Sequence, residues 1–198
     1  MGRKPQYSDD DFLDAALELV ASGGPRAATA VAVARQVGAP SGSVYHRFAS
    51  TDLILARLWI RTIKRFQAGF IEALANPDEE LGARLAAQHL LNWSRENEHE
   101  TRLMLLHRRE DLAARWPDEL GDELTTLNHG VEAAIRDYTV RRFGGATSRR
   151  LNLVAFAIVD LPYAAVRRYL IRAKVPPRTT DAVVLRAGEA LLSDPALE

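Results

Sequence analysis

Residues 33–48 of the chain read VARQVGAPSGSVYHRF. Two short segments with the apolar spacing of helices stand on either side of Gly38 and Pro40. A glycine closes a helix well because it adopts left-handed backbone angles that other residues disfavour, and a proline fits the first turn of a helix, where its missing N–H is not needed. The stretch therefore predicts two short helices joined by a tight turn.

The second of these helices is expected over residues 41–47, with Val44 and Phe48 turned inward. At ~1.5 Å per residue it is about 10 Å long, which suits a DNA major groove ~12 Å wide. Two helices joined by a glycine-containing turn form the helix-turn-helix motif, whose second helix enters that groove. Serine hydroxyls, a bare glycine backbone and the donors of tyrosine, histidine and arginine suit contacts to bases and phosphates. We expect DNA contacts from Ser41, Gly42, Ser43, Tyr45, His46 and Arg47, and from Thr29 and Arg35 of the preceding helix.

The composition narrows the class of protein. The chain has 198 residues, of which 47% are hydrophobic and 26% charged, as in ordinary globular proteins. Its formal net charge is zero, so charge alone does not indicate a nucleic-acid partner. The absence of cysteine excludes disulfides, thiolate metal sites and cysteine nucleophiles. The sequence lacks both an apolar run of ~20 residues and a secretory signal, which predicts a cytoplasmic protein without a membrane partner.

Helical periodicity continues along the rest of the chain, and no alternating strand pattern persists. Capping residues, glycines and prolines divide it into about nine helices. Their expected ranges are 8–22, 29–37, 41–47, 51–75, 78–97, 99–114, 117–143, 147–174 and 179–193. We expect an all-α fold with a three-helix domain over residues 1–50 and a larger helical domain over residues 51–198. Pro162 falls inside the helix at 147–174, where its ring is expected to cause a kink.

From Phe12 to about Leu58 the sequence resembles the TetR family of transcriptional regulators. The resemblance lies in the first helix and in Thr29, Val33, Ala34, Gly38, Gly42 and residues 45–48. It implies a homodimeric repressor that binds a palindromic operator in double-stranded DNA and releases it when a small-molecule effector fills the C-terminal domain. In relatives the last two long helices form the dimer interface. The alternative for the apolar helix at 147–174 is a central position within a monomer.

The sequence also departs from the family's pattern. Val31 stands where relatives often carry a polar residue, and valine offers only apolar contact, for example to a thymine methyl group. Arg47 stands where histidine is common, and Thr51 stands where a lysine or arginine often contacts phosphate. Fewer cations at phosphate contacts predict a shallower salt dependence of DNA binding.

The resemblance further implies that apolar side chains of the middle helices line an effector pocket. The residues expected there are Trp59, Phe66, Phe70, His89, Trp93, Met104 and His107. Aromatic residues at helical spacing are also typical of an ordinary core, and this alternative stays open. No cofactor is expected.

A helical-bundle metalloprotein or enzyme is the alternative class of function. The spacing of Glu96 and His99 is that of a di-iron ligand pair, but the motif occurs once where such bundles need two copies. The sequence contains neither an HExxH motif nor a GxSxG motif. We therefore expect no catalytic residue and no metal ligand.

Overall fold

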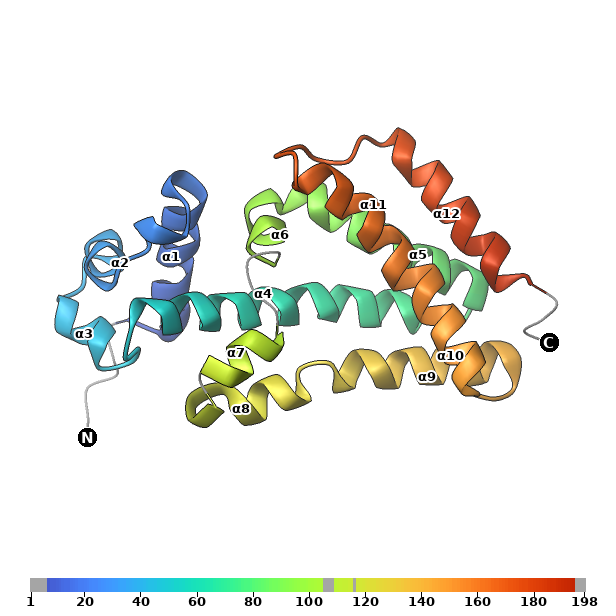
Figure 1. The fold of residues 1–198 in the computed structure, drawn as a ribbon, viewed down its shortest axis with the longest axis horizontal. Helices are drawn as coiled ribbons and strands as arrows, with labels where there is room; N and C mark the ends of the chain where they lie inside the picture. The colour runs from blue at the N-terminus through green and yellow to red at the C-terminus, as the bar shows by residue number, and fades with distance from the viewer. Residues whose placement is uncertain (1–6, 105–108, 116, 195–198) are drawn as a thin grey trace.

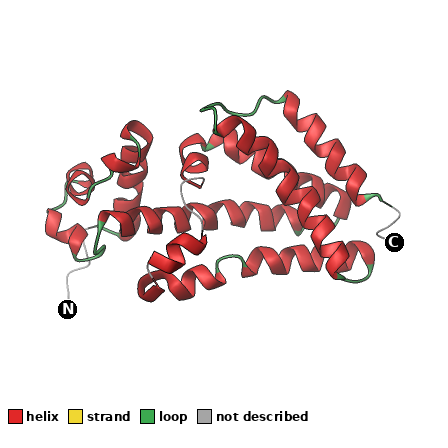
Figure 2. Cartoon of the chain, in the orientation of Figure 1, coloured by secondary structure: helices red, strands yellow, loops and turns green. Residues whose placement is uncertain are grey.

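The computed structural model describes residues 7–104, 109–115 and 117–194. Every regular element within these ranges is helical (Figure 2), so the predicted all-α fold is confirmed. None of the helices in this part of the chain is long and apolar enough to cross a membrane.

The chain begins with a three-helix unit (Figure 1), which contains α1 Asp9–Gly23, the short turn η1 Pro25–Ala27, α2 Ala30–Val37 and α3 Ser41–Tyr45. At the start of α1, the Asp11 carboxylate accepts a hydrogen bond from the Ser8 N–H at 2.7 Å, and the Ser8 hydroxyl oxygen accepts one from the Asp11 N–H at 3.2 Å. The backbone N–H of Ser8, and then its hydroxyl, hold the pKa of Asp11 below its usual value. Phe12, Val33 and Val44 are completely buried at the centre of the unit.

The longest described helix, α4 Thr51–Leu74, connects this unit to the rest of the molecule (Figure 1). Ser50 caps α4 by accepting a hydrogen bond from the Leu53 N–H at 3.1 Å. Ile54 and Leu58 of α4 are completely buried and belong to the same apolar cluster as the three-helix core. Later helices add Leu103, Leu112, Leu120 and Leu124 to that cluster. The three-helix unit is therefore packed against the larger part of the chain as well as joined to it.

The larger part surrounds the second half of α4. Its elements are α5 Glu79–Glu96, α6 Glu98–Met104, α7 Arg109–Arg115, α8 Pro117–Thr126, α9 His129–Phe143, α10 Ser148–Ala155, η2 Phe156–Asp160, α11 Leu161–Leu170 and α12 Thr179–Leu192. α5 and α9 pack along α4, and α11 and α12 pack on α5 (Figure 1). A second apolar cluster, with Phe70, Tyr138 and Ile158 among its members, fills the space between α4, α5, α9 and η2.

Two predicted helices are divided in the structure. The helix expected over residues 117–143 is interrupted at residues 127–128, between α8 and α9. Asn128 uses its side-chain oxygen to accept a hydrogen bond from Gln67 of α4 at 3.0 Å, and asparagine is a weak helix former because its amide competes for such bonds. The helix expected over residues 99–114 appears as α6 and α7, which flank residues outside the described part.

The helix predicted over residues 147–174 appears as α10, η2 and α11, which follow one another without a gap and end at Leu170. η2 is a single π-helical turn, and Pro162 lies buried directly after it, in the first turn of α11. Proline cannot donate the regular backbone hydrogen bond, and a π turn is wider than an α turn. The irregularity expected at Pro162 therefore takes the form of a π turn.

Candidate nucleic-acid interface

The turn between α2 and α3 has the features predicted from the sequence. The Thr29 hydroxyl oxygen caps α2 by accepting a hydrogen bond from the Ala32 N–H at 3.2 Å. Gly38 ends α2 with a φ of 77°, in the left-handed region. The Tyr7 hydroxyl donates a hydrogen bond to the Gly38 carbonyl oxygen at 3.0 Å. Both ends of α2 are thus held, so α3 leaves the turn in a defined direction.

α3 carries different chemistry on its two sides. Val44 is completely buried, and Phe48 just beyond the helix is nearly so. Tyr45 is 54% exposed, and a Cβ atom added to Gly42 would meet no atom within 4 Å. The residues of this stretch that are exposed or half-buried, and were predicted to contact DNA, are Ser41, Gly42, Ser43, Tyr45 and His46. The outer side of α3 therefore offers hydroxyl groups, a phenol, an imidazole and an open stretch of backbone.

α2 adds exposed side chains. Arg35 is exposed and forms no ion pair with any residue in the described ranges. Val31 lies one helical turn earlier on α2 and is 54% exposed. Thr29 is exposed as well, although its hydroxyl is used for the helix cap. Thr51 accepts a hydrogen bond from the Ala30 N–H at 3.3 Å, so this residue ties the start of α4 to the start of α2.

Arg47 differs from the expectation. Its guanidinium group donates a hydrogen bond to the Asp9 carboxylate at 2.7 Å and another to the Tyr7 carbonyl oxygen at 2.9 Å. The same group lies over the Phe12 ring, 5.6 Å from its centroid. These partners satisfy the charge of Arg47 within the three-helix unit. In the structure, Arg47 thus fastens the end of α3 to the start of α1, and its contact with DNA stays a prediction.

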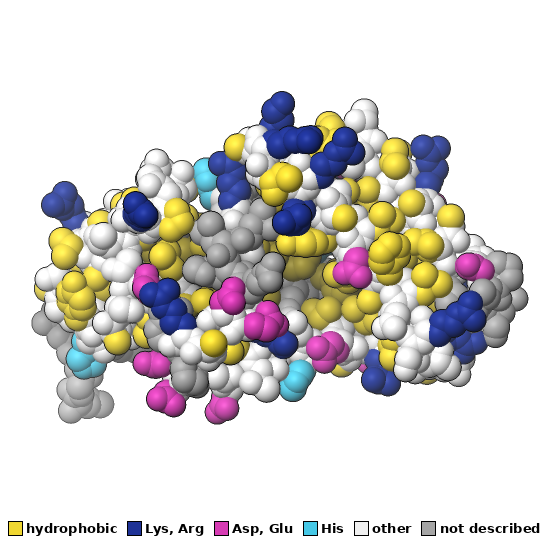
Figure 3. Space-filling view, in the orientation of Figure 1, with side chains coloured by type: hydrophobic (Ala, Val, Ile, Leu, Met, Phe, Trp, Pro, Cys, Tyr) yellow, Lys and Arg dark blue, Asp and Glu magenta, His cyan; other side chains and the backbone are white. Residues whose placement is uncertain are grey.

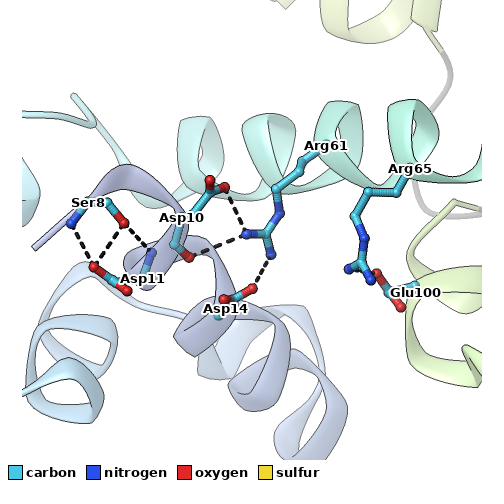
Figure 4. Close-up of polar contacts among 7 residues, drawn as sticks. All are labelled: Ser8, Asp10, Asp11, Asp14, Arg61, Arg65 and Glu100. Atoms are coloured by element: carbon cyan, nitrogen blue, oxygen red, sulfur yellow. Dashed lines mark hydrogen bonds and ion pairs between the residues drawn. The ribbon is translucent and has the colours of Figure 1, made fainter. Parts of the chain in front are cut away.

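Ion pairs attach the three-helix unit to α4 (Figure 4). The Arg61 guanidinium of α4 contacts the carboxylates of two α1 residues, Asp10 at 3.1 Å and Asp14 at 2.8 Å. About one turn further along α4, Arg65 donates a hydrogen bond to the Glu100 carboxylate of α6 at 2.5 Å. α1 and α6 are therefore both anchored to the same stretch of α4.

The residues predicted to line an effector pocket pack mainly on one another. The Phe66 and His89 rings stack with centroids 5.1 Å apart, and the Trp93 ring lies edge-on to Phe66 at 5.9 Å. His89 also lies within hydrogen-bonding distance, 2.9 Å, of the Phe66 carbonyl oxygen. The remaining described members are Phe70, Trp59 and Met104. Phe70 adjoins Phe66, and the Trp59 indole N–H donates to the Met104 carbonyl oxygen at 3.3 Å. His107 lies outside the described residues.

A cavity of about 390 Å³ lies elsewhere, between α5, α9, η2 and α12, and none of these six predicted residues lines it. Its walls include Ala87, Tyr138, Ile158 and Gly188. Sequence reasoning did not point to this place. The available signal was Gly188, because a glycine inside an apolar helix often marks a close approach of another backbone.

The metal-site alternative depended on Glu96 and His99. Glu96 is the last residue of α5, and His99 lies in the first turn of α6, so the two residues are on different helices. Within the described ranges, no three His, Asp or Glu side chains are grouped closely enough to hold a metal ion.

Residues 12–58 match the model of a family described as bacterial regulatory proteins, tetR family. This segment contains the helix-turn-helix and the first two turns of α4. None of the curated proteins matches the chain.

Solved structures of regulators share the fold over nearly the whole chain. The fatty acid degradation regulator FadR from Bacillus halodurans has a TM-score of 0.69 at 16% identity and covers 98% of each chain. The TetR family regulator PfmR from Thermus thermophilus has a TM-score of 0.62 at 19% identity, covering 91% of this chain and 96% of its own. The ketosteroid regulator KstR2 of Mycobacterium tuberculosis has a TM-score of 0.62 at 17% identity, covering 96% and 95%. Residues 12–58 therefore carry the helix-turn-helix domain of the tetR family of bacterial regulatory proteins, and the chain shares the fold of solved TetR family regulators over nearly its whole length.

Proposed function

We propose that the chain is a homodimeric repressor that binds a palindromic DNA operator and releases it when a small molecule occupies the C-terminal domain. Residues 1–50 act as the DNA-binding domain, and residues 51–198 bind the effector and the second subunit. The proposed DNA contacts come from Thr29, Arg35, Ser41, Gly42, Ser43, Tyr45, His46 and Arg47.

The observation that carries this proposal is the outer side of α3. Tyr45 is largely exposed although tyrosine usually buries its ring, and Gly42 leaves the backbone accessible. Hydroxyl and imidazole donors next to bare backbone suit phosphate oxygens and base edges in a major groove. Val44 and Phe48, on the inner side, hold α3 firmly enough for such contacts to be specific.

The dimer is proposed to form through α10, η2, α11 and α12. Figure 3 shows hydrophobic side chains spread over this face of the molecule. The large apolar side chains exposed on these elements include Phe156 (47% exposed), Tyr163 (43%) and Val183 (61%). Large exposed apolar side chains gathered on one face are typical of an interaction surface. A twofold dimer would present two α3 helices one DNA turn, ~34 Å, apart, as a palindrome requires.

Release requires that the effector bind more tightly to a dimer whose α3 helices have the wrong separation for DNA. α4 is the element suited to transmit this change because it packs against both parts of the chain. Arg61 ties α4 to α1, and Arg65 ties it to α6, so a shift of the helices around the effector is passed to the DNA-binding unit.

The test begins with selection of bound fragments from genomic DNA, which is expected to enrich an inverted repeat. Operator affinity is then measured for Tyr45→Phe and for the control Tyr169→Phe, which alters a tyrosine of α11. Tyr45→Phe is expected to weaken binding by removing a hydroxyl donor, with little change in the slope of log affinity against log salt because the tyrosine carries no charge. Light scattering reports whether the protein is a dimer. Enrichment of no repeat, or equal affinities of the two variants, would contradict the proposal.

A further inference from the structure

The cavity between α5, α9, η2 and α12 has the size and the walls of a ligand site. Its volume of about 390 Å³ lies at the lower end of the ~300–1,000 Å³ range of small-molecule pockets. The apolar part of its lining consists of Leu81, Ala83, Ala87, Ile158, Leu185 and Leu192. At ~30 Å³ for each water-sized group, it holds roughly a dozen non-hydrogen atoms.

Tyr138 of α9 adds a phenol to the wall of this cavity. The residue is only 1% exposed, and its hydroxyl forms no hydrogen bond with any residue that the structure describes. Burial raises the pKa of Tyr138 to about 12, so the side chain stays a neutral phenol at physiological pH. A phenol that lines a cavity and has no hydrogen-bond partner among the described residues is available to hydrogen-bond a ligand.

The charged residues of the lining are already neutralised by one another. Arg84 of α5 pairs with Glu189 of α12, and Arg142 of α9 pairs with Glu80 of α5 at 3.3 Å. Asp78 accepts a hydrogen bond from the Leu81 N–H at 2.9 Å as the cap of α5. A charged ligand therefore meets no unpaired Arg or Glu side chain among these lining residues to compensate for its loss of hydration. The lining therefore favours an uncharged ligand.

The backbone around the cavity includes a π turn and a helical glycine that lie close together. Ala157 and Ile158 belong to the π turn η2, a type of turn that is frequent at functional sites. Opposite them, a Cβ atom on Gly188 of α12 would lie 3.2 Å from the Ala157 carbonyl oxygen. Residues of both η2 and α12 line the cavity, so a ligand there contacts two elements of the proposed dimer face.

We propose that this cavity binds a compact, uncharged, largely apolar small molecule whose single hydroxyl or carbonyl group hydrogen-bonds to Tyr138. Ligand binding at this site does not depend on the DNA-binding domain. Its role as the effector site rests on the function proposed above.

The test uses three probes that share one apolar body: 4-propylphenol, propylbenzene and 4-propylbenzoate. Their dissociation constants are measured by titration, and thermal unfolding is followed with and without each probe. 4-Propylphenol at ten times its dissociation constant is expected to raise the Tm by about 3–6 °C. Propylbenzene is expected to bind about two- to tenfold more weakly for lack of the hydrogen bond, and 4-propylbenzoate not to bind.

Three variants locate the binding. Tyr138→Phe keeps the ring and is expected to remove the preference for 4-propylphenol over propylbenzene. Ala87→Leu fills the cavity and is expected to abolish binding of both, whereas Ala133→Leu, on the exposed side of α9, serves as its control. If Ala87→Leu does not fold, the loss of the preference for 4-propylphenol in Tyr138→Phe is the test of the site. Failure of both neutral probes to bind, tighter binding of the carboxylate, or an unchanged preference in Tyr138→Phe would overturn the proposal.

DNA binding is measured separately so that the two proposals can fail independently. Tyr45→Phe is expected to weaken operator binding and leave the affinity for 4-propylphenol unchanged. Binding of this probe that depends on Tyr138 but does not weaken operator binding would support the ligand site and contradict its role as the effector site. Operator binding by a protein that takes up neither neutral probe would support the repressor and contradict the ligand site.

Discussion

Gly38 and Gly42 allow a test in which one substitution has opposite expected effects at two neighbouring positions. A Cβ atom at either position would meet no atom within 4 Å, so alanine introduces no clash at either. Gly38 has a φ of 77°, where alanine is disfavoured by about 1–2 kcal/mol. Gly42 lies within α3 and is not among the residues with positive φ. Alanine is favoured over glycine there by about 0.5–1 kcal/mol. Gly38→Ala should therefore lower the free energy of unfolding, and Gly42→Ala should raise it.

The proposed interface predicts that the stabilised variant, Gly42→Ala, binds DNA more weakly. The methyl group of Gly42→Ala stands on the outer side of α3, where it holds the backbone away from the duplex. We expect its operator affinity to fall about tenfold, which corresponds to ~1.4 kcal/mol, although the protein is more stable. Urea unfolding gives the stabilities, and fluorescence anisotropy with a labelled operator at fixed salt gives the affinities. Gly121→Ala in α8, another helical glycine with open space, is the matched control.

Two results would refute the reasoning. An operator affinity of Gly42→Ala equal to that of Gly121→Ala would show that the outer side of α3 does not approach DNA. A loss of stability in Gly42→Ala similar to that in Gly38→Ala would show that the difference in backbone conformation is not what separates the two positions.

Three further predictions concern the rest of the chain. Arg95 and Asp181 form a bidentate pair, and both side chains are 14% exposed. Arg95→Ala is therefore expected to lower the free energy of urea unfolding by about 2–3 kcal/mol. A loss under 1 kcal/mol would contradict a buried pair. The pKa of Tyr138 is raised in the folded state, so its neutral form contributes stability that is present below pH 10 and is lost as the pH rises towards 12. Between these pH values, the free energy of urea unfolding of Tyr138→Phe should therefore fall by about 2 kcal/mol less than that of the unsubstituted protein. Parallel curves of unfolding free energy against pH for the two proteins would argue against burial of Tyr138. Arg61 pairs with Asp14, which is 67% exposed, so Arg61→Gln is expected to lower the free energy of unfolding by at most about 1 kcal/mol at low salt. Screening in 1 M NaCl should remove this difference in thermal unfolding. A difference that persists at high salt would show that the pair is shielded from solvent.

Helix ends near the N-terminus could be predicted because their causes lie within a few residues of chain. The capping side chains of Ser8, Thr29 and Ser50 each accept a hydrogen bond from a backbone N–H three residues later. Gly38 takes a left-handed conformation, and the need for it arises only from the neighbouring backbone at the end of α2. The same local logic failed at residues 127–128, where the break is stabilised by a hydrogen bond from Gln67, 61 residues away.

The sequence by itself determined the all-helical fold, the helix-turn-helix and the inward positions of Val44 and Phe48, because caps, glycines and periodicity act over one or two turns of helix. Only the tertiary structure decided that Arg47 binds Asp9, 38 residues away, and that a cavity opens beside Tyr138 between α5, α9, η2 and α12. Periodicity states which side chains face a core. Whether that core is filled depends on how closely separate helices approach, as Gly188 approaches Ala157, and no short stretch of sequence contains that distance.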